Sequence, residues 1–260
     1  MLIDKIKRKI SNLYIRSLDV NRINVASAML HQETFGQFKN YCAGKKLVVC
    51  GAGPSLKDYQ PIKDAVHIAL NRSFLFDKVD FDFIFAQDWD GIKMVQPQLI
   101  NYRPGKCVKL LGSAQCYNPK EIPESFAIAC GALRFNVDTY LYGSGFDSKF
   151  VIDIAHSSIG GMPNVGLSVM QFALYMNPSE LYIVGIDCSG AHFSNGNNND
   201  QQVAAEKKRM EQEWAEAHDR LIDKWKEFKE IATLYYPDTK IASVNPVGLK
   251  GIFEDVFQKE

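Results

Sequence analysis

The stretch Lys46-Leu-Val-Val-Cys-Gly-Ala-Gly-Pro-Ser-Leu-Lys57 decides the fold predicted for this chain. Its apolar residues 47–50 predict a buried strand, and residues 51–55 predict a tight turn that leads into a helix. Such a turn is typical of nucleotide-binding α/β sheets, because glycines let the backbone approach a phosphate and free N–H groups at a helix start can bind it. The alternative is an ordinary strand-to-loop turn. On the first reading, the candidate nucleotide contacts are Gly51, Ala52, Gly53, Pro54 and Ser55.

The turn differs from two common nucleotide motifs. The dinucleotide fingerprint requires a third glycine where Leu56 stands, and an acidic residue after the next strand, where this chain has Asn71-Arg72. No Lys-Ser/Thr pair closes a phosphate-binding loop. These differences disfavour NAD and a P-loop ATPase, and they favour a mononucleotide or a nucleotide-sugar.

Composition limits the remaining classes of protein. The 260 residues are 46% hydrophobic and include 30 Lys+Arg against 30 Asp+Glu, so there is no overall basic charge of the kind that nucleic-acid binding requires. No apolar run approaches the roughly 20 residues that span a bilayer, and no signal-peptide core is evident. The six cysteines include no Cys-x-x-Cys pair. These features predict a cytoplasmic protein without nucleic-acid partners.

The chain divides into two predicted parts. Residues 1–43 form an N-terminal helical extension, with a second helix over residues 24–42, and residues 44–260 form a nucleotide-binding α/β domain. Residues 1–20 predict a basic amphipathic helix. That helix either packs on its own domain or on a partner subunit of a homo-oligomer, or lies on the anionic surface of the inner membrane.

The α/β part alternates between strands and helices. We predict strands at 66–70, 81–86, 107–111, 181–186 and 240–244, a short strand at 126–129, and helices at 165–176, at 206–232 and from 245 to 257. Residues 112–163 are predicted as long loops, and a loop or lid is predicted at about 188–205. The fold class is an open, mainly parallel Rossmann-like sheet with helices on both faces and an N-terminal helical appendage.

Polar residues follow several of the predicted strands. Ligands bind at the carboxyl ends of the strands in open parallel sheets, so these residues are candidate contacts. Gln87 and Asp88 follow one strand, and Asp187 and Ser189 follow another. Asp187 could hold a ribose hydroxyl, a metal or an amine, or could simply form a turn. We expect it to face the 51–55 turn across a crevice that holds a nucleotide. Asn164 is a predicted N-cap that could place an anion at the helix start, or serve only as a cap.

Together these motifs resemble the bacterial sialyltransferases of glycosyltransferase family 42, and also the MptE-like and motility accessory proteins. The first resemblance implies transfer of an acidic sugar from a CMP-linked donor to a glycan acceptor, in surface glycan synthesis, without a cofactor. It implies donor contacts at the 51–55 turn, Asn71, Gln87 and Asp187, and at Asn164, Val165 and Gly166, of which only Gly166 keeps the family residue. The chain has Ala52 in place of a family asparagine, and Ser189 and Phe193 fall near two phosphate-binding tyrosines.

The resemblance also places a catalytic histidine near His218. Glycosyl transfer needs a base for the acceptor hydroxyl, and histidine suits that role near neutral pH. The alternative is that His218, among acidic neighbours, lies on a solvated helix face. His192 could stand in as a donor to the leaving phosphate, whereas His31 precedes the first strand and His67 lies inside a strand.

Two other functions stay open. An MptE-like diphosphotransferase, of the 6-hydroxymethylpterin pyrophosphokinase type, would move pyrophosphate from ATP and would need Mg²⁺, with Asp88, Asp90 and Asp187 as available ligands. A non-catalytic scaffold would use the basic N-terminal helix for binding.

Overall fold

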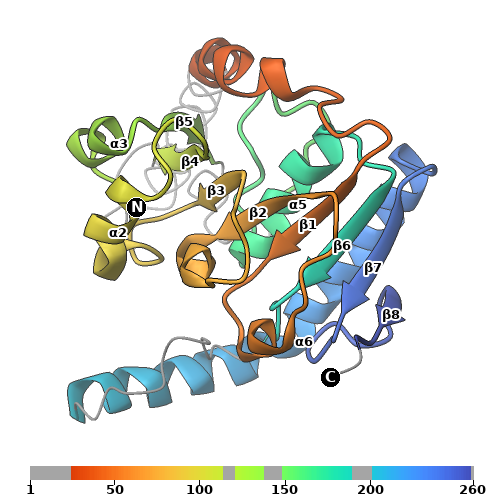
Figure 1. Cartoon of the computed structure of the whole chain (residues 1–260). Helices are drawn as coiled ribbons and strands as arrows, with labels where there is room; N and C mark the ends of the chain where they lie inside the picture. The colour runs from red at the N-terminus through yellow and green to blue at the C-terminus, as the bar shows by residue number, and fades with distance from the viewer. Residues whose placement is uncertain (1–24, 114–120, 138–147, 189–200, 259–260) are drawn as a thin grey trace, which may run out of the picture.

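The sheet of this protein is open and entirely parallel. The computed structural model describes residues 25–113, 121–137, 148–188 and 201–258. Eight strands pair in the order β5-β4-β3-β2-β1-β6-β7-β8 (Figure 1). They are β1 (Lys46–Cys50), β2 (Ala65–Leu70), β3 (Phe83–Ala86), β4 (Val108–Ser113), β5 (Leu133–Asn136), β6 (Glu180–Val184), β7 (Lys240–Val244) and β8 (Glu254–Val256).

The strand order reverses between β1 and β6. The chain builds β1 to β5 outward in one direction and then returns to the other side of β1 for β6, β7 and β8. Cys50 at the end of β1 is in register with Ala69 of β2 and with Val184 of β6. The loops that follow β1 and β6 therefore leave the sheet side by side, at the topological switch point where ligands bind in open α/β sheets.

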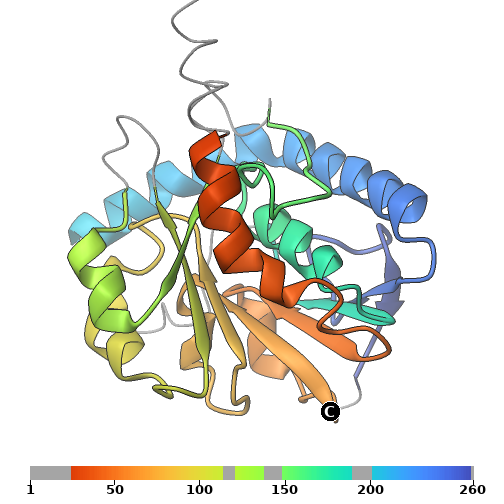
Figure 2. The ribbon, with the colours of Figure 1, turned by 90° about the horizontal axis from the view of Figure 1, so that it is seen from above.

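Helices cover both faces of the sheet. One face carries α5 (Val165–Tyr175), α6 (Gln201–Tyr235) and a helix over residues 25–35, which Figure 2 shows on the same side. The other face carries α2 (Gln96–Asn101) and α3 (Glu124–Cys130). Four short 3₁₀ segments complete the described elements: η1 (Gly36–Phe38), η2 (Pro54–Asp58), η3 (Asn71–Leu75) and η4 (Lys93–Val95).

The helix over residues 25–35 belongs to the main core. Phe35 packs against Phe135 of β5 and Phe172 of α5, at ring centroid distances of 5.9 and 5.5 Å. His31 has no exposed surface; its Nδ1 bonds the Ile154 carbonyl at 2.8 Å, and its Nε2 accepts from the Asn136 N–H at 2.7 Å. The histidine that precedes the first strand is thus part of the folded core. Residues 1–20, with their predicted surface helix, lie outside the described residues.

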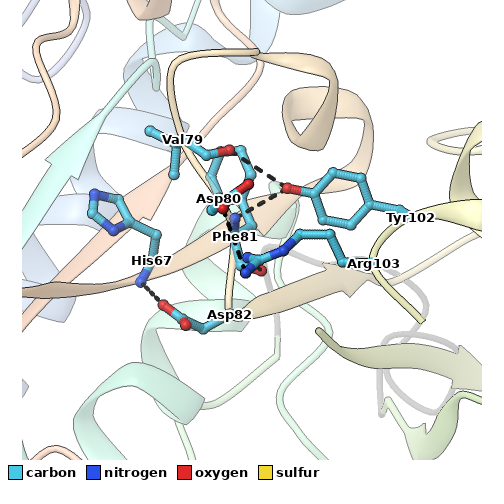
Figure 3. Close-up of polar contacts among 7 residues, drawn as sticks. All are labelled: His67, Val79, Asp80, Phe81, Asp82, Tyr102 and Arg103. Atoms are coloured by element: carbon cyan, nitrogen blue, oxygen red, sulfur yellow. Dashed lines mark hydrogen bonds and ion pairs between the residues drawn. The ribbon is translucent and has the colours of Figure 1, made fainter. Parts of the chain in front are cut away.

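A hydrogen-bonded network lies at the end of the sheet where the strands begin, which we call the amino edge (Figure 3). The Asp82 carboxylate accepts from the His67 N–H at 2.9 Å, and the Tyr102 hydroxyl accepts from the Phe81 N–H at 3.0 Å. Arg103 donates to the Phe81 carbonyl at 2.9 Å and pairs with Asp80 at 3.5 Å. These bonds fix the segments that lead into β3 and β4.

Several sequence predictions were wrong in detail. The predicted strand at 126–129 lies in α3, which begins after Pro123 with the acidic Glu124 and ends at Gly131, in the left-handed region at φ 60°. The strand of this region is β5, within the segment predicted as loops. The predicted C-terminal helix is replaced by β8, which pairs with β7. Helix α6 already begins at Gln201, so the predicted lid does not reach residue 205.

Candidate functional site

The turn after β1 and the loop after β6 are in direct contact. The Ser55 backbone N–H donates to Asp187 Oδ2 at 2.8 Å, and the Ser55 hydroxyl donates to Asp187 Oδ1 in a short bond. The Gly53 N–H donates to the Gly185 carbonyl at 2.7 Å. Asp187 is only 8% exposed. Its carboxylate therefore holds the two loops together at the switch point.

The glycines are needed for this contact between loops. A Cβ on Gly51 would collide with the Gly185 carbonyl oxygen, and one on Gly53 would lie 2.6 Å from Asp187 Oδ2. Gly185 itself has φ +67°, a backbone conformation that suits glycine. The glycine pattern that predicted close approach to a phosphate thus serves close approach of one backbone to another.

The predicted crevice between residues 51–55 and Asp187 is closed. The N–H groups of Gly51, Gly53 and Ser55 already have protein acceptors, and η2 is a five-residue 3₁₀ segment instead of a phosphate-binding helix. A small hollow beside the contact, with room for about one water molecule, is lined by Ser55, Asp187 and Ser243 among others. Ligand pockets usually measure roughly 300–1,000 Å³. A nucleotide does not fit between the turn and the carboxylate.

Three other predicted residues gather at the start of α5. The Asn164 side chain accepts from the Gly166 N–H at 2.6 Å, which confirms the predicted N-cap. A Cβ on Gly166 would lie 2.9 Å from Ile186 Cδ1, so the helix start packs tightly on the loop after β6. Gln87, after β3, accepts through Oε1 from the Ser168 hydroxyl at 2.6 Å. Ser168, in the first turn of a helix predicted as buried, was missed by the sequence analysis.

Asn71 lies at the same edge, immediately after β2. Its backbone has φ +51°, in the left-handed region that asparagine tolerates better than most residues. Its carboxamide packs against Gly91, where a Cβ would lie 2.5 Å from the Asn71 Oδ1. That Oδ1 is buried and has no hydrogen-bond partner in the described part of the chain. Asn71 thus combines an uncommon backbone conformation with an unsatisfied acceptor, a combination that is frequent at functional sites.

The acidic residues of the diphosphotransferase alternative do not gather into a metal site. Asp88 accepts from the Gly91 N–H at 3.1 Å, Asp90 pairs with Lys93 at 2.8 Å, and Asp187 is bonded to Ser55. Within the described ranges, no three His, Cys, Asp or Glu side chains are placed to hold one ion.

The structure describes one of the two candidate catalytic histidines, His218. His218 lies on α6 with 46% of its side chain exposed, and its Nδ1 is 3.4 Å from Asp219 Oδ1. Leu221 and Trp225, three and seven residues further along, and then Phe228 are buried on the same face of α6, which His218 extends toward the start of the helix. His218 is exposed, as the solvated-face interpretation predicts, but it lies on the face that α6 buries further along the helix. His192, with Ser189 and Phe193, lies outside the described residues.

The comparisons with known proteins give a distant likeness to solved structures. No family model and no curated protein matches this chain. A similar solved structure is the sialyltransferase CST-II in complex with a trisaccharide acceptor and CMP; it is 14% identical, with 82% of this chain and 86% of that chain covered and a TM-score of 0.44. A likeness this distant decides neither family nor activity. In the part of the chain that the structure describes, no helix is long and apolar enough to cross a membrane.

Proposed function

We propose that this protein is a glycosyltransferase whose donor is a nucleotide-activated sugar, with a CMP-linked acidic sugar as the first candidate. The observation that carries the proposal is Asn71, with its left-handed backbone and unsatisfied buried oxygen, at the carboxyl edge of a parallel sheet. The motif resemblance of the sequence supplies the reaction class. Glycan acceptors and bacterial surface glycan synthesis belong to the same proposal.

The donor would lie on the β2–β3 side of the switch point, beside the closed contact between Ser55 and Asp187. Asn71, Gln87 and the start of α5 supply polar groups there, while Asp187 shapes the edge by holding the two loops together. This arrangement assigns Asp187 a structural role and Asn71 a binding role. It modifies the sequence hypothesis, which assigned binding to both.

The proposed base is His218 or His192. An exposed histidine can deprotonate an acceptor hydroxyl only if the acceptor reaches it, so His218 requires an acceptor that contacts α6. The matched control is His156, another exposed histidine, whose Nδ1 lies 3.0 Å from Asp153. If His218 is the base, His218→Ala lowers kcat by at least a hundredfold, whereas His156→Ala leaves it unchanged. Equal rates for both variants would reject His218 and leave His192 to be tested in the same assay.

A nucleotide panel tests the donor. Thermal unfolding is followed with CMP, CDP, UDP, GDP and ATP, each with and without Mg²⁺, because a ligand that binds only the native state raises its stability. Stabilisation by CMP, with transfer from a CMP-sugar to a glycan acceptor, is the expected outcome. Stabilisation by ATP with Mg²⁺ alone would favour the diphosphotransferase, and no stabilisation by any nucleotide would favour the scaffold.

A further inference from the structure

Arg72 occupies a fixed position at the carboxyl edge. It follows Asn71 within η3, and the next residue anchors that segment: the Ser73 hydroxyl donates to the Cys50 carbonyl at 2.7 Å and accepts from the Leu70 N–H at 2.7 Å. Phe74, the residue after Ser73, is buried. The backbone at Arg72 is thus held beside the end of β1, next to the switch point.

The guanidinium of Arg72 has no hydrogen-bond or ion-pair partner among the residues that the structure describes. Arg103, by contrast, donates to a backbone carbonyl at 2.9 Å and pairs with a carboxylate. Arg72 is half-buried, yet within the described residues no hydrogen bond or ion pair satisfies it. Burial lowers the pKa of Arg72 from its ordinary value. An arginine keeps its charge in proteins, so a partly desolvated and uncompensated guanidinium is unfavourable unless an anion joins it.

Asn71, next to Arg72 in the chain, indicates which kind of ligand would suit both residues. Its buried Oδ1 is an unsatisfied acceptor, and Arg72 is an unsatisfied cationic donor. A ligand that offers a hydroxyl or amino group close to a phosphate or carboxylate would satisfy both. Sugars and nucleosides that carry an anionic group have this pattern, and the arginine fork matches planar or tetrahedral oxyanions.

We propose that Arg72 binds an oxyanion group of the ligand, while the adjacent Asn71 accepts a hydrogen bond from a neighbouring hydroxyl or amino group of the same ligand. This assignment deepens the proposed function and rests on it for the identity of the ligand. The oxyanion comes either from the phosphate of the nucleotide or from the carboxylate of an acidic sugar. Arg72 is then a determinant of donor specificity that the sequence analysis did not single out.

The test uses the full chain and two simple anions. Pyrophosphate and N-acetylneuraminate are titrated at constant ionic strength, and binding is followed by thermal unfolding. Arg72→Gln removes the fork, Arg72→Lys keeps the charge, and Lys57→Gln removes one exposed charge from η2 as the matched control. We expect Arg72→Gln to weaken binding at least tenfold, Arg72→Lys to weaken it less, and Lys57→Gln to bind as the unmodified chain does.

The two sources of the oxyanion give different results. A response to pyrophosphate that Arg72→Gln removes identifies the phosphate, and the same pattern with N-acetylneuraminate identifies the carboxylate. The proposal is wrong if neither anion stabilises the unmodified chain. It is also wrong if Arg72→Gln responds to the anions as strongly as the unmodified chain does. Should Arg72→Gln not fold, the Arg72 Nε–H NMR signal, assigned with Arg72→Lys, must shift on titration of the unmodified chain.

Failure of the proposed function looks different from failure of this assignment. A chain that binds pyrophosphate through Arg72 but responds to no nucleotide keeps the anion site and loses the nucleotide-sugar donor. If CMP binds equally well with and without Arg72, and neither simple anion binds, the proposed nucleotide-sugar donor stands and the proposed anion site is wrong.

Discussion

The two edges of the sheet differ in whether their polar groups have hydrogen-bond partners. At the amino edge, the Asp82 carboxylate, the Tyr102 hydroxyl and the Arg103 guanidinium all have protein partners (Figure 3). At the carboxyl edge, the Asn71 Oδ1 is buried without a partner. Satisfied networks contribute to stability, whereas an unsatisfied buried group lowers it and usually persists for another reason. The amino edge thus contributes to stability, whereas the carboxyl edge at β2 is where we propose that the ligand binds.

The contact between the two switch-point loops complicates this division, because it is both satisfied and at the carboxyl edge. Ser55 supplies two donors to Asp187, so this part of the edge stabilises the fold. The proposed binding groups lie one strand away, after β2. The carboxyl edge is therefore divided into a closed contact at β1–β6 and an unsatisfied region at β2–β3.

The largest expected effect tests the closed contact. In Gly51→Ala the new Cβ would meet the backbone carbonyl of Gly185, which cannot move without disturbing the two adjacent strands. We expect a loss of about 3 kcal/mol or more in the free energy of unfolding. Urea unfolding at neutral pH measures it.

Gly36→Ala is the control for this substitution. There a Cβ would meet only the flexible side chain of Gln32, so the expected change stays within about 1 kcal/mol. Equal losses in the two variants would show that the contact between the loops is not tight.

The second prediction concerns pH and buried neutral histidines. Burial lowers the pKa of His31 to about 4, and it also lowers the pKa of His67 at the amino edge. The folded state then binds fewer protons than the unfolded chain, whose histidines titrate near 6.5. Stability is complete above pH 6.5 and is lost as the pH falls from 6.5 towards 4. The loss from His31 reaches about 3 kcal/mol.

Urea unfolding between pH 7.5 and 4.5 checks this dependence. The variant His31→Gln should show a flatter dependence on pH than the unmodified chain, whatever its absolute stability. The exposed His156 supplies the control, and His156→Gln should keep the original slope. A steep slope in all three proteins would assign the effect to other groups.

The third prediction tests the amino edge. The Tyr59 hydroxyl lies 3.0 Å from His67 Nε2 and accepts from the Ile62 N–H at 3.0 Å. Because His67 Nδ1 lies 3.1 Å from the Ala65 carbonyl, a neutral ring donates there and accepts from Tyr59 at Nε2. Tyr59→Phe removes the partner of the buried His67 Nε2 and of the half-buried Ile62 N–H, and we expect it to lower stability by about 1–3 kcal/mol. Ligand affinity, measured by calorimetry, should not change.

Particular residues show how far sequence reasoning reaches. The buried parallel strands appear as continuous apolar runs such as Leu47–Cys50, so most strands and the helix after Asn164 could be predicted from pattern alone. The run at 126–129 was too short for its period to distinguish strand from helix. The signals that decide it are Glu124 in the first turn and Gly131 at the end.

The site was harder to predict than the fold. The bond between Ser55 and Asp187 joins residues 132 positions apart in the sequence. Whether the carboxylate binds a ligand or the neighbouring loop depends on how closely the folded chain brings these two residues together. The glycine turn has the same sequence in either case. The unpaired state of Asn71 and Arg72 is likewise a property of the packed structure, because the sequence does not say which acceptors reach them.

The smallest effect on stability is expected at Asn71, and this substitution distinguishes most clearly between the two edges of the sheet. Asn71→Gly keeps the positive φ, which glycine adopts freely, and removes the unsatisfied oxygen. The gain from removing that oxygen offsets the greater entropy of glycine in the unfolded chain, so stability should change by less than about 1 kcal/mol. Nucleotide affinity should fall at least tenfold.

Tyr59→Phe and Asn71→Gly then form a crossed pair, in which one loses stability and keeps affinity while the other does the reverse. If Asn71→Gly instead lowered stability as much as Tyr59→Phe and left affinity unchanged, the unsatisfied oxygen would have no role in binding, and the carboxyl edge would be as structural as the amino edge.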